Sequence, residues 1–300
     1  MRLLAALFLM AGVFFPPAQP GAGQVDQPRP ESSTTQDYLT VHNVRPVHDL
    51  TRGAEARVGI LDHSFGQDVH PELYAGGSRF LPSSAQPGIG TEETHQGYWM
   101  ALALHEVAPA ADIFALDVIG SSEAETVAAL ERALDWAVEH DLDVVTYCSG
   151  ALTATAREYL DPVVERTVAA GVVIVFVDYP HPMNLLPGGF SAPGTEPENT
   201  PDLNIFSYDC TALFADTFVA LIESDDNGIQ RHRPFLARPS TGSVTAGFVA
   251  LLRSLDPEVS PASIKNILVQ TSRPMVVRGL EGPKAPDAFS AVSRLRETGF

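Results

Sequence analysis

Short apolar runs alternate with longer segments of helical spacing through the first two-thirds of the chain. Residues 58–61 form a run without polar side chains, which is typical of a strand buried on both faces. Residues 124–138 instead place Val127, Leu130 and Leu134 three and four positions apart, which predicts an amphipathic helix. The same two patterns predict strands at 113–118, 144–147 and 172–177, and helices at 99–104 (with Val107) and 159–170.

This order of strands and helices favours a three-layer α/β fold. We expect a mainly parallel sheet of about seven strands with helices on both faces. In such sheets ligands and chemistry gather at the carboxyl ends of the strands. The first candidates for a site are therefore the residues that follow three predicted strands, namely Asp62, Cys148 to Gly150, and Asp178 to Pro180.

The pattern changes in the last third of the chain. Residues 180–203 hold six prolines and are predicted to be a loop. A hairpin is predicted around Asn227-Gly228, because Asn-Gly is a strong signal for a tight turn between strands. Helices are predicted at 245–255 and from Pro261 to Gln270, the second with Ser260 as its N-cap. We see no repeat and no second core, and expect one domain over residues 39–300.

The N-terminal residues have the pattern of an export signal. Arg2 precedes an apolar run at 3–15, and prolines and small residues follow it. The run is too short to cross about 30 Å of hydrocarbon as a helix. We therefore expect a signal peptide at residues 1–23, a disordered polar leader at 24–38, and a secreted or periplasmic mature chain that does not insert into a membrane.

Composition narrows the possible partners. The formal net charge of −18 disfavours binding to nucleic acid and to anionic lipid. We predict no cofactor and no metal site, since His63, His95 and His105 do not have the spacing of known zinc motifs. Export permits a disulfide between Cys148 and Cys210, but the sequence does not decide whether it forms.

One segment carries a specific resemblance. The run VGILDHSF at 58–65, followed by HPEL at 70–73, resembles the aspartate motif of the subtilisin-like serine peptidases. The resemblance implies that a buried strand ends in the triad aspartate, which falls on Asp62. In that family Thr-Gly usually follows, whereas this chain has His63 and Ser64. The acid of the triad is therefore present, while its immediate neighbours differ.

The second family motif, His-Gly-Thr at the start of a helix, is altered. Val107 to Pro109 match the Val-Ala-Pro that follows it, and residues 111–118 continue the match. Counting back at the usual family spacing places the triplet on Gln96-Gly97-Tyr98. A glutamine amide cannot accept a proton from a hydroxyl near neutral pH, so Gln96 cannot be the base. His95 lies one residue earlier and could serve only if the register shifts by one.

The serine motif is altered in the same way. Residues 237–252 match the family helix through Ala246-Gly247 and Ala250-Leu251-Leu252, and this register places Pro239 on the nucleophile. Ser240 lies one residue later, and Ser243 falls on a family proline. The oxyanion asparagine falls on Pro180, while Asn184 is out of register. The substrate-binding strand falls on Cys148, Ser149 and Gly150, and we interpret Cys148 as a small buried side chain.

The resemblance continues at 260–274 and at 285–292, so that it runs from about Leu39 to Val292. It implies the family fold, but loss of the base and the nucleophile predicts a pseudo-peptidase that binds a peptide or a protein. Two alternatives stay open. One is an active serine endopeptidase with a shifted triad of Asp62, His95 and Ser240, and the other is a different activity that uses Cys148 or the histidines.

Overall fold

The computed structural model describes residues 38–82, 96–147, 152–177, 179, 181–185, 204–208, 211–215, 219–224, 230–235, 240–277 and 280–298. The chain divides into two units, Met1–Thr35 and Gln36–Phe300, and all described residues lie in the second. The predicted signal peptide and almost all of the leader thus lie outside the described residues. Among the described residues, no helix is both long enough and apolar enough to span a bilayer.

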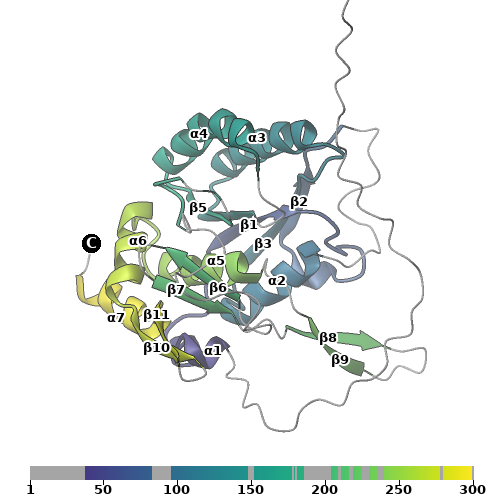
Figure 1. The fold of residues 1–300 in the computed structure, drawn as a ribbon. Helices are drawn as coiled ribbons and strands as arrows, with labels where there is room; N and C mark the ends of the chain where they lie inside the picture. The colour runs from purple at the N-terminus through teal and green to yellow at the C-terminus, as the bar shows by residue number, and fades with distance from the viewer. Residues whose placement is uncertain are drawn as a thin grey trace, which may run out of the picture. The chain divides into compact units, whose positions relative to one another are not determined.

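The main sheet is fully parallel, as the alternation of strands and helices predicts. Within the described residues it has five strands in the order β2-β3-β1-β4-β5, fewer than the number expected from the sequence. Because neighbouring strands are parallel, the chain between them must cross over the sheet (Figure 1). The strands are β1 (Arg57–Asp62), β2 (Gly76–Arg79), β3 (Asp112–Asp117), β4 (Val144–Tyr147) and β5 (Val173–Phe176).

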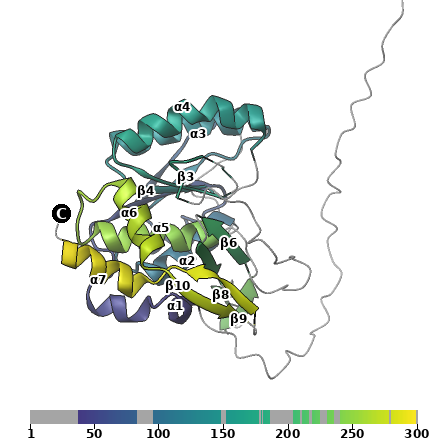
Figure 2. The same cartoon turned by 60° about the vertical axis from the view of Figure 1, so that its left-hand side comes forward.

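Two apolar layers form because successive side chains of a strand point to opposite faces. Val58 and Ile60 of β1 pack in one cluster with residues of α2 and α5, whereas Leu61 packs in a second cluster with residues of α3 and α4. Figures 1 and 2 show these helix pairs on opposite faces of the sheet. The helices are α2 (Gln96–Val107), α3 (Glu123–Glu139), α4 (Ala154–Ala169) and α5 (Ser240–Arg253).

Side-chain caps fix where several helices begin. The hydroxyls of Ser122 and Thr153 accept the first free backbone amides of α3 and α4. The predicted N-cap Ser260 is confirmed, because its hydroxyl accepts the Ser263 amide of α6 (Pro261–Gln270). The helices α3, α4 and α6 therefore begin directly after a residue whose side chain caps them.

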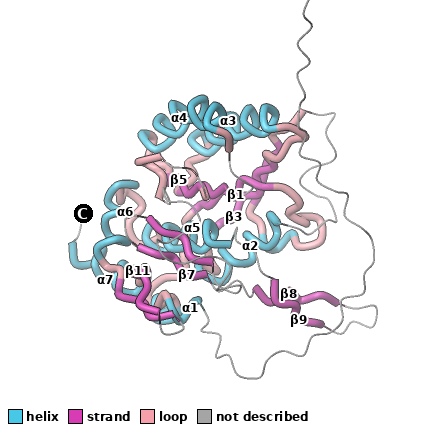
Figure 3. The backbone as a smooth tube through the Cα atoms, viewed as in Figure 1, coloured by secondary structure: helices cyan, strands magenta, loops and turns pink. Residues whose placement is uncertain are grey.

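Smaller elements complete the second unit. The predicted hairpin is confirmed by the antiparallel pair β8 (Val219–Ser224) and β9 (Gln230–Phe235). A further sheet has the order β10-β11-β7-β6 and lies on the side of α5 (Figure 3). The other elements are β6 (Asn204–Tyr208), β7 (Thr211–Ala215), β10 (Arg273–Val277), β11 (Leu280–Ala285), α1 (Tyr38–Val41), α7 (Ala288–Thr298), and the 3-10 helices η1 (Arg45–Asp49) and η2 (Pro71–Leu73).

Candidate functional site

Asp62 ends β1 at the carboxyl edge of the sheet, where the sequence predicts the site. Its side chain is fully buried, and one carboxylate oxygen accepts the His63 amide at 2.8 Å. Side chains two residues apart on a strand point to the same face of the sheet. Asp62 therefore lies on the same face as Ile60, and α2 and α5 cover that face. The buried carboxylate therefore lies on the face of the sheet that α2 and α5 cover.

Gln96 is the first residue of α2, and the structure brings it to the end of β1. The Gly97 amide donates to the His63 carbonyl at 3.0 Å, so the start of α2 is joined to the residue after Asp62. A methyl group added to Gly97 would lie 2.5 Å from that carbonyl oxygen, so a side chain cannot fit there without displacement. His95 lies outside the described residues.

The third predicted position lies at the start of α5. This helix begins at Ser240 and packs against α2, β1, β4 and β5. Its close approach to α2 depends on Gly247, because a methyl group there would lie 2.6 Å from Val107 Cγ1. Pro239 precedes the helix and lies outside the described residues. Among the described residues, the contacts therefore join the end of β1 to the start of α2, and α2 to α5.

The other predicted site residues are not tested. Cys148, Ser149, Gly150 and Pro180 lie outside the described residues, as does any bridge between Cys148 and Cys210. Asn184 is described and fully buried, and its side-chain amide bonds the backbone of Phe176 and Tyr179. Its amide therefore holds the chain that follows β5.

A row of charged side chains crosses three strands beside Asp62. Asp62 pairs in register with Asp117 of β3, which in turn pairs with Arg79 of the edge strand β2. Asp117 is almost completely buried, and Arg79 Nε lies 3.5 Å from its carboxylate. Burial raises the pKa of Asp117, and the positive charge of Arg79 opposes that shift. No group of three or more potential metal ligands occurs among the described side chains.

The sequence marks His63 and Ser64 as departures from the family motif, and it does not indicate a contact between them. In the structure, His63 Nδ1 lies 2.7 Å from Ser64 Oγ, and His63 Nε2 lies 3.9 Å from Asp62 Oδ1. Ser64 has a φ of 55°, in the left-handed region that favours glycine. The signal was the sequence Asp-His-Ser at the end of a buried strand, which places three reactive side-chain types at one turn.

Ser64→Gly is expected to be more stable than Ser64→Ala by about 1 kcal/mol, because alanine bears a Cβ in the left-handed region. Both variants lose the hydroxyl, so their comparison isolates the backbone effect. Urea unfolding followed by circular dichroism measures the difference. Equal stabilities of the two variants would contradict a left-handed Ser64.

Comparisons with known proteins agree with the geometry. Subtilisin E of Bacillus subtilis is 25% identical over 130 residues, covering 41% of this chain and 33% of that protein. Subtilisin Savinase of Lederbergia lenta is 30% identical over 131 residues, covering 41% of this chain and 47% of that protein. The chain is thus similar in sequence to subtilisin-like serine peptidases. No protein-family model matches it, and the chain spans less than half the length of these relatives.

The fold comparison reaches further along the chain than the sequence comparison. The structure of MycP1 from Mycobacterium smegmatis superposes with a TM-score of 0.57 at 14% identity, covering 88% of this chain and 86% of that one. At this identity the likeness shows the fold alone. It confirms the predicted three-layer subtilisin-like architecture.

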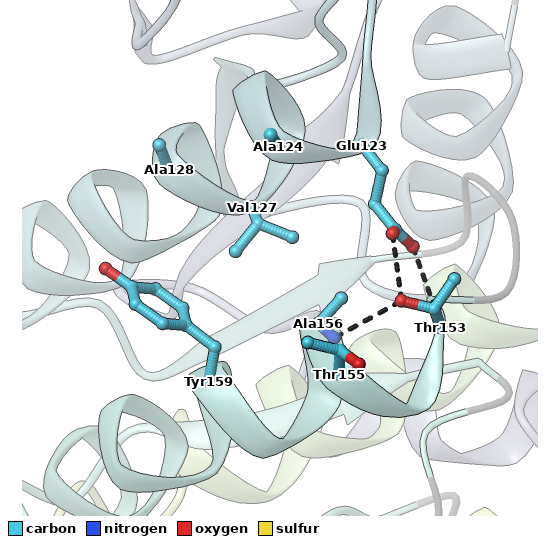
Figure 4. A pocket seen from close by; sticks show the side chains of 8 residues that line it. All are labelled: Glu123, Ala124, Val127, Ala128, Thr153, Thr155, Ala156 and Tyr159. Atoms are coloured by element: carbon cyan, nitrogen blue, oxygen red, sulfur yellow. Dashed lines mark hydrogen bonds between the residues drawn. The ribbon is translucent and has the colours of Figure 1, made fainter. Parts of the chain in front are cut away.

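A separate cavity of about 370 Å³ lies between the first turns of α3 and α4. Its walls are mainly alanines, Val127 and the ring of Tyr159 (Figure 4). At one end the Glu123 carboxylate accepts hydrogen bonds from the amide and hydroxyl of Thr153. Neither Asp62 nor Gln96 lines this cavity, so it is distinct from the candidate site.

Proposed function

We propose that this subtilisin-like chain is a secreted pseudo-peptidase that binds a peptide or protein partner without cleaving it. The observation that carries the proposal is Gln96 at the start of α2, joined through Gly97 to the turn after Asp62. In this family that helix start holds the general base. An amide has no basic lone pair near neutral pH, so a serine hydroxyl there would not be activated.

The residues that remain suit binding. The close contacts at Gly97 and Gly247 keep α2 against the end of β1 and against α5, which holds these three elements together as a rigid framework for a partner. Removing one member of a Ser-His-Asp triad lowers the rate by roughly 10⁴ to 10⁶ without requiring loss of the cleft. The high negative charge favours partners that are not nucleic acid or anionic lipid.

A second candidate is an active serine endopeptidase that uses Asp62, His95 and Ser240. Ser240 is the first residue of α5, and a helix start is where this family places its nucleophile. Subtilisin E and Savinase, to which the chain is similar, are named as subtilisins. Loss of casein hydrolysis in Ser240→Ala, from a measurable rate in the unmodified chain, would favour this candidate.

The double variant Gln96→His and Pro239→Ser is expected to show no turnover of casein or a quenched peptide. Pro180 occupies the position of the family's oxyanion asparagine, and it has no side-chain amide to donate a hydrogen bond. Stabilising the oxyanion is worth roughly 3 to 4 kcal/mol. Pro239 also fixes φ just before α5, so a serine there need not enter the helix in the same way. The unmodified chain is the control, and clear turnover by the double variant alone would contradict a remodelled binding cleft.

A further inference from the structure

The end of β1 carries an acid, an imidazole and a hydroxyl on three consecutive residues. Asp62 is fully buried, while the His63 side chain retains 35% of its exposure. His63 Nδ1 is within hydrogen-bond distance of Ser64 Oγ, and its Nε2 faces the Asp62 carboxylate at 3.9 Å. A nucleophile bonded to a base, with a carboxylate behind the base, is the arrangement that activates a serine.

The backbone at this turn presents the hydroxyl. Ser64 occupies a left-handed conformation with a φ of 55°, and the family usually has glycine at this position. Nucleophilic serines of other hydrolases also lie on sharp, strained turns at the end of a strand. Ser64 as a whole residue is neither fully buried nor fully exposed.

The start of α2 lies directly against the same turn. The Gly97 amide bonds the His63 carbonyl, so the amino-terminal end of a twelve-residue helix faces residues 62–64. The positive end of the helix dipole favours negative charge nearby. The start of α2 therefore adjoins the turn that contains Ser64, and its dipole favours negative charge there.

We propose that Ser64 is a nucleophile, with His63 as its base and Asp62 as the positioning carboxylate, and that it accepts acyl groups from small activated esters. Ser64 Oγ forms a bond to the ester carbonyl carbon as its proton passes to His63 Nδ1. The carbonyl–alkoxide bond then breaks, and the leaving alcohol takes that proton. Water hydrolyses the acyl-serine by the reverse roles. This inference goes beyond the proposed binding function and does not depend on it.

A fluorophosphonate probe tests the nucleophile directly. Its phosphorus forms a bond with the serine oxygen, fluoride leaves, and the hydroxyl proton passes to the base. We expect peptide mapping of the labelled full chain to place the phosphonyl group on Ser64. Ser64→Gly suits the left-handed turn and should abolish labelling while the chain stays folded, as judged by circular dichroism. The exposed Ser121, which bonds Glu125, provides a matched control, and Ser121→Ala should label like the unmodified chain.

His63→Gln is expected to slow labelling at least about 100-fold, as removal of a general base does. An unchanged rate in this variant would overturn the role of His63. Absence of labelling in the unmodified chain would overturn the inference and leave the binding function standing. A phosphonyl group on Ser240 in place of Ser64 would overturn both, because it would identify the shifted peptidase triad.

Discussion

Replacing Arg253 with methionine is expected to lower the free energy of unfolding by about 3 to 5 kcal/mol, because it removes two hydrogen bonds of a charged donor and the ion-pair partner of a largely buried carboxylate. Arg253 is the last residue of α5 and is almost completely buried. Its guanidinium donates to the carbonyls of Pro257 and Gly171, and its Nε lies 3.8 Å from the Asp143 carboxylate. It thus ties the end of α5 to the segments that precede β4 and β5. Urea unfolding of the full chain measures the loss.

The double variant Asp143→Asn and Arg253→Met is the control for the charge. It should recover part of the loss, because no unpaired carboxylate remains buried. The Asp143 carboxylate also accepts the Arg57 amide, and an asparagine oxygen can keep that bond. No recovery in the double variant would contradict an electrostatic origin and point to lost packing instead.

The Arg253→Met loss should also depend on pH in a defined direction. Burial raises the pKa of Asp143, while the Arg57 amide and the charge of Arg253 lower it. Without Arg253 the folded-state pKa rises further above the unfolded value of about 3.9. A carboxyl with a raised folded pKa adds stability at low pH that is lost as pH rises from the unfolded towards the folded pKa. The deficit of Arg253→Met should therefore be smaller at about pH 4 than at pH 7.

Gly97→Ala is expected to lower the free energy of unfolding by about 2 to 3 kcal/mol, near the upper part of the range for overpacking. The added methyl group would lie 2.5 Å from the His63 carbonyl oxygen and 2.7 Å from the Phe65 ring. Alanine normally favours a helix over glycine, so a loss here reports the contact and not helix propensity. Thermal or urea unfolding gives the value.

Gly76→Ala is the matched control for this position. Its added methyl group would lie no closer than 3.3 Å to the Phe114 ring, which is a tight but tolerable contact. We expect a change within about 1 kcal/mol for this variant. If Gly97→Ala were as mild, α2 would not be held closely against the turn after β1.

The sequence predicts the main strands and helices because their burial is encoded locally. Residues 58–61 lie within β1, and the spacing of Val127, Leu130 and Leu134 corresponds to the buried face of α3. β2 was not predicted, since Gly76-Gly77-Ser78-Arg79 has neither an apolar run nor alternation. This strand lies at the edge of the sheet and forms through backbone pairing with β3. Its position depends on the fold around it.

A residue of the candidate site can be predicted where a sequence motif places a characteristic residue type at the end of a strand or at the start of a helix. Asp62 could be placed because the carboxyl end of β1 follows from the pattern. The pattern begins the helix at Trp99, so Gln96, the first residue of α2, could be placed only from the family spacing. The proximity of His63 Nδ1 to Ser64 Oγ could not, because it depends on a left-handed turn. The hydrogen bond of Arg253 to Gly171 and its ion pair with Asp143 could not be predicted either, because they join residues far apart in the chain.

We propose that this chain binds peptides at the end of β1 and the start of α2 without cleaving them. The most direct measurement is turnover of a mixed, quenched peptide library by the purified full chain, with Subtilisin Savinase as the positive control and mass spectrometry of the peptides that stay bound. We expect no fluorescence gain above the blank, and intact peptides in the bound fraction. Progressive cleavage by the unmodified chain, abolished in Ser240→Ala, would contradict it.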